Sequence, residues 1–145
     1  MQIEVRYQSR GGNTKAVAEM IAKEFQVSAL SIDHPVKEYT DILFLGGGVY
    51  GWKMDKSLCE FIKQLPKEKV GQIVAFSTTG LMESTLKQIR QEAEQKGIRV
   101  NQNELLIKMM LRGHSMLGLE GGNLTKEQQE KVQEFVKVIQ REMER

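Results

Sequence analysis

Hydroxyl groups and glycines gather in the segment that follows the first predicted strand. Glycines let the backbone approach a ligand closely, and the first amides of a helix, which have no partner inside the helix, attract anions. Because this segment leads directly into a predicted helix, we expect it to bind a phosphate group. The alternative interpretation is a glycine-containing turn with an Asn or Thr cap. The residues are Ser9, Arg10, Gly11, Gly12, Asn13 and Thr14.

A second glycine-rich segment, which also holds two aromatic residues, follows the third predicted strand. Aromatic rings on a loop beside a ligand are suited to stacking on a flat heterocycle. We therefore expect Tyr50 or Trp52, the only tryptophan of the chain, to lie against such a ring. The alternative is that both side chains only cover the next helix. The segment consists of Gly46, Gly47, Gly48, Val49, Tyr50, Gly51, Trp52 and Lys53.

Short polar residues follow the fourth predicted strand. They are Ser77, Thr78, Thr79 and Gly80. We expect their backbone amides to hydrogen-bond the edge of a bound ring, although such residues are common in turns of every kind. Open parallel sheets bind ligands at the carboxyl ends of their strands, which is where all three segments are predicted to lie.

Two other nucleotide-binding motifs are excluded. Gly46, Gly48 and Gly51 satisfy the spacing G-x-G-x-x-G, but the predicted helix begins several residues later and no acidic residue ends the next strand, so a dinucleotide fingerprint is not indicated. The Walker pattern fails because Trp52 occupies the position of its lysine.

Hydrophobic periodicity predicts five strands alternating with four helices. The strands lie within residues 3–7, 26–32, 41–45, 72–77 and 100–111, and the third is apolar on both faces, as a central parallel strand requires. The helices lie at about residues 17–25, 55–65, 84–97 and from 125 onward, with Ser84 as a cap and Thr125 and Gln128 as a capping box. This order predicts a single α/β domain over residues 1–145 with a mostly parallel sheet.

The connection between the second and third strands is unusually short. It has about eight residues, Asp33 to Thr40, which is too few for a crossover helix. One face of the first two strands is therefore expected to be thinly covered. Glu4 and Arg6 are predicted to point out on that bare face, while Ile3 and the other apolar residues of the strand face the helices.

Composition limits the classes of function. The chain has 145 residues, of which 40% are hydrophobic and 28% charged, and its net charge of +2 without a Lys/Arg-rich stripe argues against nucleic acid as a partner. Apolar runs are far shorter than the roughly 20 residues of a membrane span, and the charged N-terminus is unlike a signal peptide, so we expect a cytoplasmic location and no membrane contact. Cys59 is the only cysteine, and His34 and His114 lie far apart, so we predict neither a disulfide, a metal site nor a catalytic side chain.

These motifs resemble those of the flavodoxin family. Ser9, Gly12 and Thr14 are in register with its phosphate loop, Thr/Ser-x-Thr-Gly-x-Thr, and Gly11 replaces a hydroxyl residue. The run from Gly48 to Trp52 is similar to the flavin-flanking loop of short flavodoxin-like proteins. The resemblance implies a flavodoxin-like three-layer sandwich with a five-stranded parallel sheet in the order 2-1-3-4-5, here without a full helix between strands 2 and 3.

The resemblance also implies FMN as the cofactor. Its phosphate would lie on residues 9–14, and its isoalloxazine ring between the segments that follow strands three and four. The implied function is electron transfer through a non-covalently bound flavin, to a redox partner protein or a small electron acceptor. Electron carriers of this family are strongly acidic, whereas this chain has a pI of about 8.6. Two alternatives therefore stay open: an FMN-dependent oxidoreductase that reduces a small acceptor such as a quinone, and a flavin-free binding module on the same fold.

Overall fold

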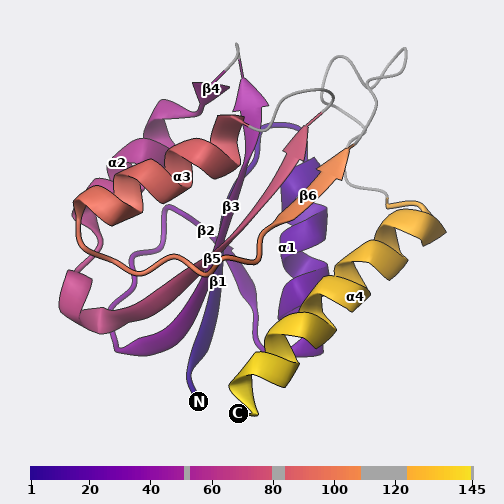
Figure 1. Ribbon diagram of the computed structural model, residues 1–145. Helices are drawn as coiled ribbons and strands as arrows, with labels where there is room; N and C mark the ends of the chain where they lie inside the picture. Colours follow the sequence, from indigo (N-terminus) through magenta and orange to yellow (C-terminus); the bar gives the residue numbers. More distant parts are fainter. Residues whose placement is uncertain (51–52, 80–83, 109–123, 145) are drawn as a thin grey trace.

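The computed structural model in Figure 1 describes residues 1–50, 53–79, 84–108 and 124–144. The elements in chain order are β1 (Ile3–Gln8), α1 (Asn13–Glu24), β2 (Ala29–Ser31), β3 (Thr40–Tyr50), β4 (Lys53–Met54), α2 (Lys56–Gln64), the short 3-10 helix η1 (Lys67–Lys69), β5 (Val70–Thr79), α3 (Ser84–Gln95), β6 (Leu105–Lys108) and α4 (Lys126–Met143).

The sheet confirms the predicted topology. Its strands follow the order β2-β1-β3-β5-β6, and all four of these pairings are parallel. The two-residue strand β4 pairs with the end of β3 in the antiparallel direction. The five parallel strands, counted along the chain, therefore stand in the order 2-1-3-4-5 of a flavodoxin-like α/β fold.

Helices cover both faces of this sheet. Figure 1 shows α1 and α4 on one face and α2 and α3 on the other. Two separate clusters of buried apolar side chains correspond to these two layers. Strand β3 contributes to both clusters, because Phe44 packs with the α1 and α4 side while Leu43 and Leu45 pack with the α2 and α3 side. Burial on both faces of the central strand was predicted from its apolar run and is confirmed.

The predicted ends of two helices have different outcomes. The capping box before α4 is confirmed: Thr125 Oγ1 accepts a hydrogen bond from the Gln128 amide, and the Gln128 side chain accepts one from the Thr125 amide. The prediction that Ser84 caps α3 is wrong. Ser84 is already the first described residue of that helix, and its buried hydroxyl has no hydrogen-bond partner in the part of the chain that the structure describes.

Strand β3 is longer than predicted. The glycines expected to form a loop continue the strand, and Gly46, Gly47 and Gly48 pair in parallel with residues 76–78 of β5. The reason lies in packing: a Cβ atom on Gly46 would lie 2.3 Å from the ring of Phe76, and one on Gly47 would lie 2.7 Å from Leu58 Cδ2. Gly46 and Gly47 are therefore required by side chains of neighbouring elements, and their first role is structural.

The connection between β2 and β3 has no helix, as predicted, but the face beneath it is covered. Arg6 was expected to be exposed there, and this is wrong, because its side chain is only 3% exposed. Its Nε donates to the carbonyl of His34 at 2.8 Å, and its Nη2 donates to Glu4 at 2.8 Å and to the carbonyl of Pro35 at 3.3 Å. The short connection between β2 and β3 thus covers the guanidinium of Arg6, and its carbonyl groups accept hydrogen bonds from it.

A cavity of about 670 Å³ lies beside this cover. It is lined by residues of the β1 and β2 edge and of the connection, among them Glu4, Leu30, Lys37 and Tyr39. None of the residues predicted to bind a ligand lines it. Its buried charged group, Arg6, is already paired within the chain, so we assign no ligand to this cavity.

Candidate functional site at the carboxyl edge of the sheet

The three predicted segments converge because of the strand order. The carboxyl ends of β1, β3 and β5 lie side by side, with Gln8 opposite Gly47 and Gly48 opposite Thr78. This edge is at the top of Figure 1. The predicted phosphate segment, the glycine-rich segment and the polar segment after the fourth parallel strand therefore end at one edge of the sheet.

We call the N-terminus of α1 open because, among the described residues, it has neither an N-cap side chain nor an acidic residue in its first turn. Its N-cap is Gly12, which has a φ of 93°, and the first turn holds no acidic residue. Glycine adopts this left-handed conformation without the strain that a Cβ atom causes. Ser9 Oγ accepts a hydrogen bond from the Gly12 amide at 3.0 Å, which holds the preceding turn in place. The helix thus presents first-turn amides and the positive end of its dipole without an N-cap side chain or a first-turn carboxylate to neutralise them.

Two predicted residues from different segments are in direct contact. The hydroxyls of Thr14 and Thr78 lie 2.6 Å apart, and both side chains are buried, with exposures of 1% and 6%. One of the two hydroxyls donates this hydrogen bond, so the proton of the other is available to a further acceptor. The contact links the start of α1 to the end of β5 and places one hydroxyl proton at the edge where an anion is expected.

Two more hydroxyl groups stabilise the ends of the strands. Ser77 Oγ donates to the carbonyl of Gly47, and Thr85 Oγ1 donates to the carbonyl of Gly48, both at 2.7 Å. The side chain of Ser77 is fully buried. Its hydroxyl therefore holds β5 against β3. The contact with a ligand that was predicted for Ser77 would have to come from its backbone.

Arg10 makes a contact that the sequence analysis missed. Its Nε and Nη2 donate to Asp55 Oδ2 at 3.1 and 2.8 Å, and Gln8 Nε2 donates to the same oxygen at 3.3 Å. The other carboxylate oxygen caps α2 by accepting from the Ser57 amide and hydroxyl at 2.8 and 2.6 Å. Asp55 before a helix is a recognisable capping signal. Nothing along the chain connects it to Arg10, because that proximity comes from the pairing of β1 with β3.

The pKa of Asp55 is below its usual value. Burial by itself raises this pKa, but the hydrogen bonds from Ser57 and Arg10 and the charge of Arg10 outweigh that effect. Asp55 is therefore a carboxylate at neutral pH. It places a negative charge next to the segment that is predicted to bind phosphate.

Two buried oxygen atoms near this edge have no partner in the described part of the chain. They are Gln8 Oε1, at the end of β1, and Ser84 Oγ, at the start of α3. Buried polar atoms without a hydrogen bond are costly, and they are commonly explained by a bound molecule or water. With the open helix N-terminus and the spare hydroxyl proton, they make the described residues compatible with a polar, phosphate-bearing ligand.

Part of the predicted ring-binding surface is not described. Gly51, Trp52 and Gly80 lie outside the described residues. Val49, Tyr50 and Thr79 are described as strand residues, but their side chains are not. The prediction that Tyr50 or Trp52 stacks on a ring therefore stays a prediction.

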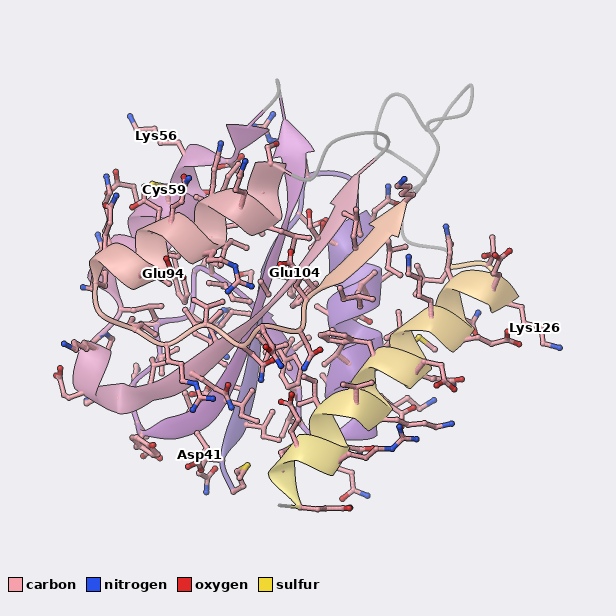
Figure 2. The ribbon with its side chains drawn as sticks, viewed as in Figure 1. Asp41, Lys56, Cys59, Glu94, Glu104 and Lys126 are labelled. Atoms are coloured by element: carbon pink, nitrogen blue, oxygen red, sulfur yellow. The ribbon has the colours of Figure 1, made fainter. Side chains whose placement is uncertain are left out.

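Cys59 lies on α2, three residues after Lys56, the first residue of that helix (Figure 2). The thiol is partly buried against the cluster beneath α2 and α3, and this burial, together with the nearby Glu92, raises its pKa. A protonated thiol is a poor nucleophile, which agrees with a structural role for Cys59. Among the described residues, no three His, Cys, Asp or Glu side chains are grouped as a metal site would need.

No helix in the described part of the chain is long and apolar enough to cross a membrane.

Comparison with known proteins identifies a family and several similar folds. The family model described as a flavodoxin domain matches residues 5–114. A flavodoxin from the domain Archaea is 20% identical with a TM-score of 0.62, over 97% of this chain and 99% of that one. The flavodoxin of Megasphaera elsdenii, solved in its two-electron reduced form, is 21% identical with a TM-score of 0.63, over 93% and 98% of the two chains.

A longer protein contains a similar unit. The flavodiiron core of Flv1 from Synechocystis sp. PCC6803 is 13% identical with a TM-score of 0.63, over 96% of this chain. The chain spans only 36% of the length of that protein. At these identities the structural matches describe the fold alone. A search of curated proteins found no match to this sequence.

Proposed function

Because this chain belongs to the flavodoxin domain family, we propose that it binds FMN without a covalent bond and functions as a redox protein. The flavin, when bound, supplies the electron-transfer chemistry, and the protein supplies binding, orientation and the electrostatic environment. The observation that carries the proposal is the open N-terminus of α1 behind Gly12, at the edge where three predicted segments meet.

The proposal assigns a role to residues of all three segments. The first amides of α1 and the spare proton of the Thr14 and Thr78 pair hold the phosphate group. The hydrogen bond from the Gly12 amide to Ser9 Oγ fixes the turn before α1 and so holds these donors close together. Backbone groups of residues 78–80 contact the edge of the flavin ring, and Tyr50 or Trp52 stacks on the ring.

A titration with FMN and with riboflavin tests the proposal. We expect FMN to bind, with a flavin absorption band that shifts on binding, and riboflavin to bind much more weakly because it lacks the phosphate. Equal affinity for the two flavins would contradict the phosphate site. If neither flavin binds, the chain is the flavin-free binding module on the same fold.

The charge of the chain favours a second candidate role. Its pI is about 8.6 and its net charge is +2, so it lacks the strongly acidic character of a carrier that docks on basic partners. Lys56, the exposed first residue of α2, adds a positive charge next to Asp55 in the sequence (Figure 2). A small neutral acceptor needs no charged docking surface. This supports an FMN-dependent oxidoreductase that reduces a small acceptor such as a quinone.

Rapid mixing of the reduced, FMN-loaded protein separates these two roles. With benzoquinone as the acceptor, an oxidoreductase is expected to reach a limiting rate as the quinone concentration rises, because the quinone occupies a site. With cytochrome c as the acceptor, an electron carrier is expected to react quickly, at a rate that rises in proportion to the cytochrome c concentration. Fast transfer to cytochrome c and a linear, slow reaction with benzoquinone would favour the carrier.

A further inference from the structure

The contact between Arg10 and Asp55 joins two groups with opposite relations to a phosphate. Arg10 belongs to the proposed phosphate segment and lies two residues before Gly12, the N-cap of α1. A guanidinium in this place is a suitable partner for phosphate oxygens, because its N–H groups match their geometry. In the structure, however, two of these N–H groups are directed at the carboxylate of Asp55.

We propose that Asp55 is a built-in competitor for the phosphate group, whose carboxylate holds the Arg10 guanidinium that a phosphate monoester would otherwise bind. This inference rests on the proposed function, and it adds a residue that sets the affinity of the site. Asp55 acts here through Arg10, without itself contacting the ligand.

The two oxygens of Asp55 have separate tasks, which makes the exchange possible. Oδ1 caps α2 through Ser57, and Oδ2 holds Arg10 and Gln8. When Arg10 leaves, the cap is unaffected, and Oδ2 keeps the amide of Gln8 as a donor. The carboxylate, whose side chain is 12% exposed, is therefore not left buried without a hydrogen bond.

Exposure of Arg10 also favours the exchange. Its side chain is 61% exposed, so moving the guanidinium from one anion to another removes little of its hydration. A partly exposed ion pair contributes little to stability, whereas a hydrogen bond between a guanidinium and a phosphate carrying close to two charges is charge-assisted and stronger. Phosphate is thus expected to displace the carboxylate, and the net affinity is reduced by the pair that is broken.

The variant Asp55→Asn tests the proposal, because asparagine also caps helices well while it removes the negative charge. We expect this variant to bind FMN about tenfold more tightly than the wild type does. Its affinity for riboflavin is expected to stay within a factor of two of the wild-type affinity. In an Arg10→Gln background, the same substitution is expected to raise FMN affinity by no more than about twofold, which is the part due to the removed negative charge itself. An equally large gain in that background, or weaker FMN binding with α2 intact, would overturn the proposal.

A matched control removes one carboxylate elsewhere. Asp41 lies at the opposite end of the sheet, at the start of β3 (Figure 2). Asp41→Asn therefore changes the net charge of the protein by the same amount as Asp55→Asn, but at a position far from the site. We expect it to leave the affinity for FMN unchanged. A gain in FMN affinity equal to that of Asp55→Asn would show a general charge effect and overturn the proposal.

A measurement without flavin keeps this inference separate from the proposed function. Inorganic phosphate is titrated against the amide NMR signals of Gly11, Gly12 and Thr14, in the wild type and in Asp55→Asn. We expect about tenfold tighter phosphate binding in the variant, whether or not the chain binds a flavin. Equal or weaker phosphate binding in the variant would overturn the role of Asp55, even if FMN binding by the wild type confirmed the proposed function.

Discussion

Helices α1 and α2 begin at the same edge of the sheet, but their N-termini are built in opposite ways. The N-cap of α1 is Gly12, which has no side chain, and the first turn of that helix has no acidic residue. The N-cap of α2 is Asp55, whose carboxylate accepts from the Ser57 amide at 2.8 Å. A carboxylate of the chain neutralises the positive end of α2, whereas no N-cap side chain or first-turn carboxylate among the described residues does so for α1.

This difference shows how one physical rule gives two results. Every helix N-terminus attracts negative charge, because its first amides are unpaired and its dipole is positive there. Where the sequence supplies a carboxylate, the result is a stable helix start. Where it supplies a glycine with positive φ, the result is a place for an external anion. Arg10 connects the two helix starts, because it lies two residues before the N-cap of α1 and donates to Asp55, the N-cap of α2.

The largest expected effect comes from the hydroxyl at the open terminus. Thr14→Val keeps the shape of the side chain but removes its hydroxyl, so a hydrogen bond to the phosphate is lost, directly or through Thr78. We expect FMN affinity to fall by about 1.5–3 kcal/mol, which is the range for hydrogen bonds to charged groups. Calorimetric titration with FMN measures this.

Thr14→Ser is the matched control, because it restores the hydroxyl at the same position. We expect it to recover most of the FMN affinity. Riboflavin binding is expected to respond much less to either variant. If Thr14→Val binds FMN as tightly as the wild type, the hydroxyl pair has no part in phosphate binding, and the contrast between α1 and α2 loses its functional meaning.

The second prediction concerns the backbone of the open terminus. Gly12 has a φ of 93°, where an L-residue is strained, so Gly12→Ala is expected to lower the free energy of unfolding by about 1–2 kcal/mol. Gly11→Ala is the control, since Gly11 is not among the residues with positive φ. Urea unfolding of both variants without flavin measures the difference. Equal losses in the two variants would mean that the turn does not depend on glycine at position 12.

Most of the fold could be predicted because local signals and packing agree. The apolar run of β3, the capping box at Thr125 and the short connection before β3 each have one physical explanation, and the structure confirms them. The glycines of β3 were misread because glycine usually marks a turn. Only the positions of Phe76 and Leu58 in space show why a strand needs glycine there.

The site could be predicted only in part, because its contacts connect distant parts of the chain. Thr14 and Thr78 are 64 residues apart, and Arg10 and Asp55 are 45 residues apart. Each segment has a recognisable composition, so the segments could be found. Which side chains meet depends on strand register, and for Arg6 on carbonyl groups of a connection that has no regular structure.

The smallest expected effect comes from removing the N-cap side chain of α2. Asp55→Ala removes the cap of α2, and we expect the free energy of unfolding to fall by about 1 kcal/mol at neutral pH. Asp55→Asn is expected to lose less, because its amide oxygen still accepts from Ser57. If Asp55→Ala is as stable as the wild type, the N-terminus of α2 does not need its carboxylate, and the two helix starts differ less than their geometry implies.

The pH dependence of the same variants separates the charge of Asp55 from its shape. The folded-state pKa of Asp55 lies below its ordinary value of 3.8, so the folded protein binds this proton less readily than the unfolded chain does. The stability that the charge contributes is therefore fully present above the ordinary pKa and is lost as the pH falls through the folded-state value. We expect the stability difference between the wild type and Asp55→Asn to be constant from neutral pH down to about pH 5 and to shrink below about pH 4. Urea unfolding of both proteins across this range measures it, and a difference that grows toward acid would mean that the contacts from Ser57 and Arg10 do not favour the carboxylate.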